Sequence, residues 1–330
     1  MTSIALAAAP GRSLWRGAQT VGLILTLALI GALWVVPKVT LHLLWDMVIP
    51  LLPAVFLVNP MLWRNVCPLA TVNDLTWVRR DRGALGHLRP AWSIGIVLLL
   101  VLVPARRFLF NENGPALAIT VTLVAALALV AGLRFARRSG FCNSICPVLS
   151  VEKLYGQSPL LDVRTARCAD CTLCTPVGCI DLASTKTIAQ TIGPLRRDTG
   201  WLRTSFGAFV AAFPGFIIAY FTTENGGLST AAAVYSRVLL WCAASYSMVA
   251  VLTIVFRARA AIVMPLLGAV AVGLYYWYAA PTIAEAFWAP SAGATVVRGL
   301  ALLLVGVWLA RNVMRRRPRV VGAAAGSLTG

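Results

Sequence analysis

The sequence predicts an all-α protein, a polytopic membrane helix bundle with about eight transmembrane helices. The first observation is composition, because 59% of the 330 residues are hydrophobic and only 12% are charged. A soluble domain of this length carries roughly twice that share of charged residues. The second is that apolar runs of about 18 or more residues, long enough to cross a bilayer, recur along the chain. The third is a one-sided distribution of lysine and arginine between successive runs.

The apolar runs give the expected spans in order. They fall near residues 18–36, 40–59, 91–110, 114–133, 204–223, 231–256, 260–280 and 293–311. The second run differs from the others because it contains His42, Asp46, Pro50 and Pro53. Its two prolines predict a kinked helix, and its ionisable residues make it a candidate functional region.

The basic residues predict the orientation of these spans. If the N-terminus is cytoplasmic, all but five of the 29 lysines and arginines fall in cytoplasmic segments. The exceptions are Lys38, Arg106, Arg107, Arg237 and Arg298. This positive-inside pattern accounts for most of the net charge of +18 and places both termini in the cytoplasm. The basic inner face could also attract an acidic soluble electron carrier. Nucleic-acid binding is not expected, since the basic residues flank spans instead of lining one face of a folded module.

The spans and polar segments divide the chain into six regions. They are an N-terminal segment with the first helix pair (1–59), a cytoplasmic loop (60–90), a second helix pair (91–133), a cysteine-rich cytoplasmic segment (134–203), a four-helix membrane region (204–311) and a basic cytoplasmic tail (312–330).

An internal repeat relates the first two helix pairs. The stretch NVCPLATVNDL, residues 65–75, aligns with SICPVLSVEKL, residues 144–154, at an offset of 79. Each copy follows a helix that runs towards the cytoplasm, so the pairs form a parallel repeat. The second copy begins C-x3-C-P with Cys142 and Cys146, whereas Trp63 stands in the first copy where Cys142 stands in the second. The first copy therefore retains Cys67 alone.

Four further cysteines lie close together in RCADCTLCTPVGCIDL. They are Cys168, Cys171, Cys174 and Cys179, with the spacing C-x2-C-x2-C-x4-C. The continuous triple is typical of three ligands of a [4Fe–4S] cluster, whose fourth ligand is a distant cysteine, often one followed by proline. A zinc site and unligated thiols are the alternatives, but zinc usually takes two separated pairs or histidine. Disulfides are not expected on the reducing side of a membrane.

The spacing also predicts how the cysteines divide between clusters. Cys146, followed by proline at a helix start, is the expected remote ligand of the triple. By the same logic Cys179 belongs to a second cluster, for which Cys142 and Cys67 are candidates. Eight ligands are needed for two cubes, and the cytoplasmic segments supply seven cysteines. Either the second cluster has a non-cysteine ligand or three irons, or only one is bound. The eighth cysteine, Cys242, lies within a span and is interpreted as a small buried apolar residue.

These motifs resemble the polyferredoxin-type membrane iron–sulfur proteins, namely the NapH-like quinol dehydrogenase subunits and the membrane part of NosR-like maturation factors. The resemblance covers roughly residues 18–200. It implies a small ferredoxin-like loop module on the cytoplasmic face of a bacterial inner membrane. The sequence departs from the family pattern in two ways: Trp63 replaces a cysteine of the first motif, and one C-x2-C-x2-C run is present where the family commonly has two.

The same resemblance implies single-electron transfer between the quinone pool or a soluble ferredoxin- or flavodoxin-like carrier and a partner oxidoreductase. The chain would then be an electron-transfer subunit within membrane lipid and not a stand-alone catalyst. Two alternatives remain: a maturation factor that delivers electrons to metal sites of another enzyme, and a transporter with a structural or sensory cluster.

His42 and Asp46 have two interpretations, a quinone head-group site or a satisfied polar pair between helices. A transmembrane haem with two histidine ligands is not expected, because His87 is the only other histidine and lies in a cytoplasmic loop.

Overall fold

A computed structural model describes residues 12–74, 91–135, 140–161, 199–287 and 290–316, and every regular element among them is helical. The first repeat contains α1 (Arg12–Val35), α2 (Pro37–His42), the π-helix η1 (Leu43–Val48), α3 (Ile49–Val58), α4 (Pro60–Val66) and α5 (Pro68–Asp74). The second contains α6 (Ala91–Ala105), the π-helix η3 (Arg106–Phe110), α7 (Gly114–Arg134), the π-helix η5 (Phe141–Ile145) and α8 (Leu149–Tyr155). The remainder comprises η8 (Thr199–Arg203), α10 (Ser205–Thr222), η9 (Leu228–Thr230), α11 (Ala231–Val255), α12 (Ala260–Ala286) and α13 (Pro290–Arg316).

Eight of these helical stretches are long and apolar enough to cross a membrane, which confirms the predicted number of spans. They are Leu14–Val35, Pro37–Val58, Ser93–Phe110, Gly114–Arg134, Ser205–Thr222, Leu228–Val255, Ala260–Ala286 and Ala292–Met314. Each overlaps the corresponding predicted span. The protein is therefore a polytopic, membrane-embedded helical protein. Most of the predicted ferredoxin-like module lies outside the described residues, since 162–198 are not among them.

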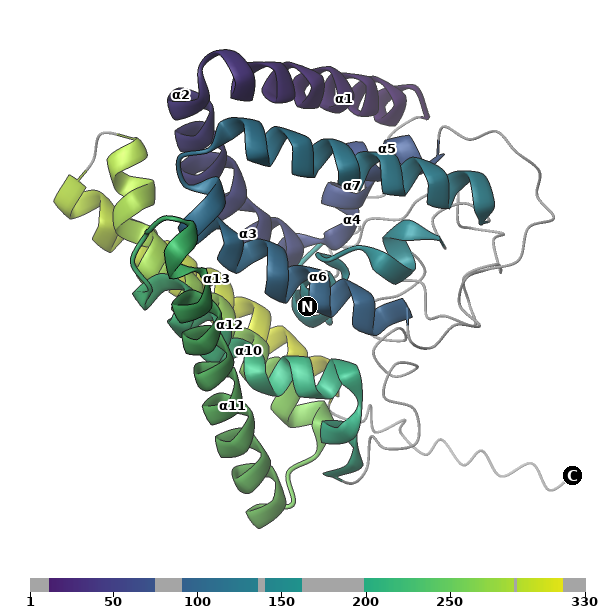
Figure 1. Cartoon of the computed structure of the whole chain (residues 1–330). Coiled ribbons are helices and arrows are strands. Elements are labelled where there is room, and N and C mark those ends of the chain that lie inside the picture. The colour runs from purple at the N-terminus through teal and green to yellow at the C-terminus, as the bar shows by residue number, and fades with distance from the viewer. Residues whose placement is uncertain (1–11, 75–90, 136–139, 162–198, 288–289, 317–330) are drawn as a thin grey trace, which may run out of the picture.

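Among the four C-terminal spans, α10 is the most buried, and it is also the most buried of all eight. α10 packs on α11 and α12, and α12 packs on α13. In Figure 1 these helices form one group, while α1 and α7 lie side by side on the opposite side of the molecule. The α3 and α6 spans contact the C-terminal group. Side chains of α3, α6, α8 and α10–α13 therefore share one large apolar core.

A row of aromatic side chains explains the burial of α10. Five rings recur at intervals of three and four residues, so they lie on one helix face. They are Phe206, Phe209, Phe213, Phe216 and Tyr220, each at most 8% exposed. Neighbouring rings in this row have centroids 4.7 to 6.5 Å apart. Tyr155 of α8 extends the row towards the second Cys-Pro motif, with its ring centroid 6.4 Å from that of Phe213.

The second span is irregular where its prolines predict a kink. The π-helix η1 precedes Pro50, and Pro53 lies inside α3. Between them a side chain enters the helical hydrogen-bond ladder: Ala54 N donates to the Tyr276 hydroxyl at 3.0 Å, and that hydroxyl donates to Pro50 O at 2.7 Å. The insertion satisfies a carbonyl and an amide that would otherwise bond each other, which is one of the recognised causes of a local helix distortion.

The two repeats have matching geometry at their Cys-Pro turns. Cys67 (φ −57°, ψ 123°) ends α4 and Cys146 (φ −55°, ψ 123°) ends η5, so the backbone leaves the helix in the same direction in both copies. A glycine of a neighbouring span packs against each turn. A Cβ at Gly22 would lie 2.9 Å from the carbonyl oxygen of Val66, and a Cβ at Gly95 would lie 2.8 Å from that of Cys146. These observations support the internal repeat.

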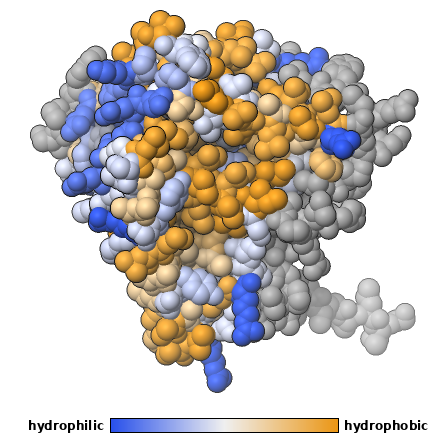
Figure 2. All heavy atoms as spheres, viewed as in Figure 1, coloured by the Kyte–Doolittle hydropathy of each residue, from blue (hydrophilic) through white to orange (hydrophobic). Residues whose placement is uncertain are grey.

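Apolar side chains cover much of the described surface in Figure 2, as expected for helices that face lipid. The exposed faces of α1, α11 and α13 are rich in leucine, valine and isoleucine, for example Leu27, Leu240 and Leu303. A continuous apolar surface of this kind would be a liability in water, and in a bilayer it requires no partner.

Substitution of the two contact glycines by alanine is expected to destabilise the protein. The added methyl of Gly22→Ala or Gly95→Ala would meet a backbone oxygen at under 3 Å, and such overpacking costs about 1–3 kcal/mol. Gly31→Ala is the matched control, because a Cβ there meets nothing within 4 Å. Thermal unfolding in detergent measures the effect. Equal melting temperatures for Gly95→Ala and Gly31→Ala would contradict the packing described here.

Candidate metal centre

The structure brings together three of the seven predicted cysteine ligands. Cys67 and Cys146 are half-buried and Cys142 is buried, and all three belong to one apolar cluster formed by both repeats. The other members of the cluster are Leu69, Ala70, Val124, Ala128, Ala131, Phe135, Phe141 and Ile145. Residues separated by about 80 positions in the chain thus meet at one end of the bundle.

Local sequence explains why each Cys-Pro pair forms a turn. Proline has no N–H and fixes φ near −65°, so it ends the preceding helix and suits the start of the next one. Pro68 is the first residue of α5, while Pro147 lies two positions before the first residue of α8, Leu149. The cysteine amides close the preceding helices: Cys67 N donates to Trp63 O at 2.7 Å and Cys146 N to Phe141 O at 3.0 Å.

Cys142 has a different environment from the two Cys-Pro cysteines. Its side chain is 6% exposed on the π-helix η5, and its Sγ lies 3.7 Å from Asn73 Oδ1 of α5, to which it donates a weak hydrogen bond. Asn73 in turn packs against Gly132 of α7. In the first repeat Trp63 occupies the corresponding position and packs against the main core. The replacement of a cysteine by tryptophan therefore removes a thiol and adds apolar contact.

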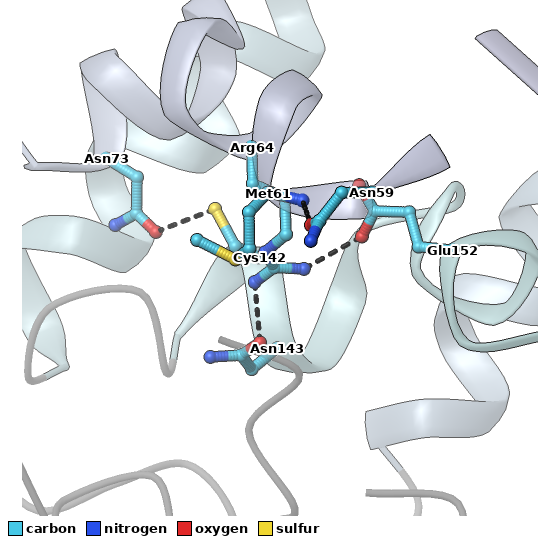
Figure 3. A network of polar contacts seen from close by, with 7 residues as sticks. All are labelled: Asn59, Met61, Arg64, Asn73, Cys142, Asn143 and Glu152. Atoms are coloured by element: carbon cyan, nitrogen blue, oxygen red, sulfur yellow. Dashed lines mark hydrogen bonds and ion pairs between the residues drawn. The ribbon is translucent and has the colours of Figure 1, made fainter. Parts of the chain in front are cut away.

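A buried polar network joins the two Cys-Pro turns (Figure 3). The Arg64 side chain, on the last turn of α4, donates from Nη1 to Glu152 Oε2 of α8 at 2.8 Å and from Nη2 to Asn143 Oδ1 of η5 at 2.7 Å. The Arg64 and Glu152 side chains are each 3% exposed. A buried charge is tolerated when it is paired and hydrogen-bonded, and here the pairing spans the two repeats.

The network residues occupy equivalent positions in the repeat. Arg64 and Asn143 correspond at the offset of 79, and so do Asn73 and Glu152. Each repeat therefore supplies one charged and one neutral member. Arg64 of the first repeat donates hydrogen bonds to Glu152 and Asn143 of the second. In the reverse direction, Cys142 of the second repeat donates to Asn73 of the first. This pseudo-symmetric arrangement holds the cysteine-bearing turns against each other.

The Cys146 thiol has a perturbed acidity. Desolvation by burial is the largest cause that raises the pKa of Cys146, and together with the nearby Glu152 carboxylate and Cys67 thiol it brings the pKa to about 12 against the opposing effects of the Val148 N–H and Arg64. Desolvation disfavours the thiolate in all such sites. Metal ligation requires the thiolate, so a positively charged metal would have to supply the compensating charge. In the folded protein without a metal, the Cys146 thiol is therefore poorly suited to acting as a free nucleophile.

The other four predicted ligands, Cys168, Cys171, Cys174 and Cys179, lie outside the described residues. Among the residues that the structure does describe, no three histidine, cysteine, aspartate or glutamate side chains come close enough to hold a metal ion by themselves. A complete ligand set would thus require cysteines from 162–198. The assignment of Cys146 to the triple, and of Cys179 to a second site, stays a prediction.

The described residues on either side of 162–198 are anchored near the Cys-Pro turns. Before it, Leu161 N donates to Val58 O at 3.0 Å and Asn59 Nδ2 donates to Leu161 O at 2.8 Å, next to the start of α4. After it, η8 leads into α10, where the Ser205 hydroxyl lies 2.9 Å from that of Ser93 at the start of the α6 span. Leu161 and η8, which flank 162–198 in the sequence, therefore both lie at the end of the bundle that carries Cys67 and Cys146.

His42 and Asp46 lie at the opposite end of the second span. His42 Nδ1 is 2.6 Å from Asp46 Oδ2, and Arg106 Nη2 of η3 is 3.5 Å from Asp46 Oδ1. Arg106 also donates to the Tyr220 hydroxyl at 2.8 Å. Sixteen helical residues separate His42 from Val58, which corresponds to about 24 Å. His42 and Asp46 thus pair within one span, and Arg106 joins Asp46 to the next span. The choice between a quinone head-group site and a satisfied polar pair stays a prediction, and the distance separates these residues from the cysteines.

Cys242 lies in α11, half-buried and packed against the main core. It lies within a span as predicted, although it is only partly buried where the sequence predicted a buried residue. It is remote in sequence from every cysteine of the cluster described above, and it provides a matched thiol for control substitutions.

Sequence reasoning missed the polar network. Arg64 directly precedes the aligned stretch, and Asn73 and Glu152 stand opposite each other within it, but an alignment of repeats shows which residues correspond and not which residues touch. The available signal was chemical: one arginine and one glutamate, each a few residues from a cysteine, in segments predicted to meet. Lys153, also buried beside Glu152, was missed for the same reason.

The fold defines a polytopic helical membrane protein in which two related helix pairs present cysteine turns at one end. No family model, no curated protein and no solved structure matches this chain. The function is therefore argued from the site alone.

The thiol of Cys146 in the metal-free folded protein is expected to resist alkylation. Because its pKa is raised from an ordinary 9.0 to about 12, the thiolate fraction at pH 8 is far below that of the unfolded chain. The rate for the folded protein should rise with pH up to pH 11, whereas the rate for the unfolded chain should level off above its ordinary pKa. The measurement is mass-spectrometric alkylation across pH 7–11, with urea-unfolded protein as the control. Equal rates for folded and unfolded protein would show that the thiol is not desolvated.

Proposed function

We propose that the protein is a membrane-bound iron–sulfur electron-transfer protein. It would pass single electrons between the quinone pool or a soluble carrier and a partner oxidoreductase. The observation that carries this proposal is the convergence of Cys67, Cys142 and Cys146 from two repeats, beside both ends of the segment that contains the other four cysteines. Seven cysteines in such an arrangement suit thiolate ligation of iron–sulfur clusters better than they suit disulfides or a single zinc ion.

A cubane cluster supplies a one-electron carrier when it is bound. The chain would provide its thiolate ligands, exclude water through the apolar side chains around Cys142, and hold the two turns in register through Arg64 and Glu152. A first cluster would use Cys146 with Cys168, Cys171 and Cys174. A second would use Cys179 with Cys142 and Cys67 and would need one further ligand.

The basic residues support the orientation of the site. With the N- and C-termini in the cytoplasm of a bacterial cell, the cysteine turns face the cytoplasmic side of the inner membrane, following the positive-inside rule. A basic cytoplasmic face would favour an acidic electron carrier through long-range attraction. Exchange with the quinone pool would take place at the same end of the bundle, since His42 and Asp46 lie about 24 Å of helix away.

Anaerobic purification is expected to yield a coloured protein with about four irons and four sulfides per chain for one cluster and about eight for two. Reduction should produce an electron paramagnetic resonance signal. Cys146→Ser should lose or alter that signal because it removes the remote ligand of the triple. Cys242→Ser is the matched control and should leave iron content and spectrum unchanged. A colourless, iron-free protein prepared without oxygen would refute the proposal.

Reoxidation kinetics distinguish the proposed electron-transfer role from a maturation role. The reduced protein in nanodiscs should be reoxidised over repeated cycles by a short-chain benzoquinone or by an acidic ferredoxin-like carrier, and high salt should slow only the reaction with the carrier. A single stoichiometric discharge into a metal-free partner enzyme, with no reaction towards either oxidant, would favour the maturation factor instead.

A further inference from the structure

The ion pair between Arg64 and Glu152 is placed where it can act on both Cys-Pro cysteines. Arg64 lies three residues before Cys67 on the helix that Cys67 terminates. Glu152 lies on α8, the helix that follows Cys146 and Pro147. Both side chains are 3% exposed and 2.8 Å apart. A pair this deeply buried is weakly screened by water or salt, so each charge acts strongly on the groups next to it.

A buried ion pair of this kind is not explained by stability alone. Two charges removed from water recover little net free energy, and well-packed apolar residues often serve as well. The corresponding positions in the other repeat, Asn143 and Asn73, are neutral. The chain therefore carries an arginine and a glutamate at places where its own repeat shows that neutral side chains fit. This difference suggests that the two charges have an electrostatic role besides packing.

The chemistry of the expected ligands suggests what that role is. A thiolate-ligated cluster becomes more negative on reduction, and its potential depends on net charge, hydrogen bonding and exposure at the site. The positive charge of Arg64 favours the reduced state, whereas the negative charge of Glu152 favours the oxidised state. Residues around the ligands commonly tune a metal in this way.

We propose that Arg64 and Glu152 are positioning residues that lock the two Cys-Pro turns together and set the reduction potential of the iron–sulfur cluster bound there. This inference rests on the proposed function. Arg64 fixes the geometry by bonding Glu152 and Asn143 across the repeat boundary (Figure 3). The balance between its charge and that of Glu152 fixes the potential. Lys153 is a further buried charge nearby and is common to every variant below.

The test is a redox titration, followed by electron paramagnetic resonance, of the anaerobically purified full-length protein in nanodiscs. Arg64→Gln removes the positive charge and should lower the midpoint potential. Glu152→Gln keeps a side-chain oxygen for Arg64 and should raise it. We expect the ratio of reduced to oxidised cluster at a fixed potential to change about tenfold in each case, in opposite directions, which is about 59 mV for one electron. Arg64→Lys keeps the charge and should restore most of the potential.

Two further variants separate a charge effect from a loss of structure. Asn143→Asp is nearly isosteric and adds a negative charge next to Arg64 Nη2, so it should lower the potential even if Arg64→Gln does not fold. Arg106→Gln removes an arginine from the ion pair at the opposite end of the bundle, and should leave the potential unchanged whatever it does to the melting temperature.

The outcomes are distinct. Opposite shifts for Arg64→Gln and Glu152→Gln support the inference. An unchanged potential in every variant that retains its cluster overturns it and leaves the pair a purely structural contact. Absence of any cluster in the unsubstituted protein instead refutes the proposed function, and the inference with it.

Discussion

The structure depends on one requirement, that the guanidinium of Arg64 and the carboxylate of Glu152 stay together out of water. Each comes from a different repeat, and each is buried. Loss of either partner leaves an uncompensated buried charge, which typically costs about 3–5 kcal/mol. The bonds from Arg64 to Glu152 and Asn143 therefore fix how the turns that carry Cys67 and Cys146 lie against each other. Apolar packing of the residues around Cys142 accompanies them.

The membrane helices make this junction possible by close backbone approach. Gly22 and Gly95 allow a neighbouring span to pack directly against the carbonyl oxygens at each turn, as small residues generally do between membrane helices. On the other side, α10 provides a rigid aromatic face, and Tyr155 links that face to α8. The cysteine turns of the two helix pairs are thus packed against neighbouring spans on one side and linked through α8 to the C-terminal group on the other.

Much of the fold follows from the sequence because the relevant information is local. Hydropathy predicts the eight spans, and their bounds agree with the structure to within about six residues. Pro53 indicates that the second span is irregular. The repeat predicts that Cys67 and Cys146 occupy equivalent turns. Contacts between segments are a different matter. No periodicity in the sequence predicts the bond from Arg64 to Glu152 or the insertion of the Tyr276 hydroxyl between Pro50 and Ala54. Both arise from tertiary packing, which places polar groups opposite partners that sequence spacing does not specify.

The central claim is that the two repeats are energetically coupled through Arg64 and Glu152. A double-mutant cycle with Arg64→Met, Glu152→Met and the double variant, measured by unfolding in detergent, tests it most directly. The account predicts a coupling free energy of at least about 1 kcal/mol, with the double variant more stable than the two single effects imply. Additivity to within about 0.3 kcal/mol would show that the side chains do not interact and that something else holds the turns together.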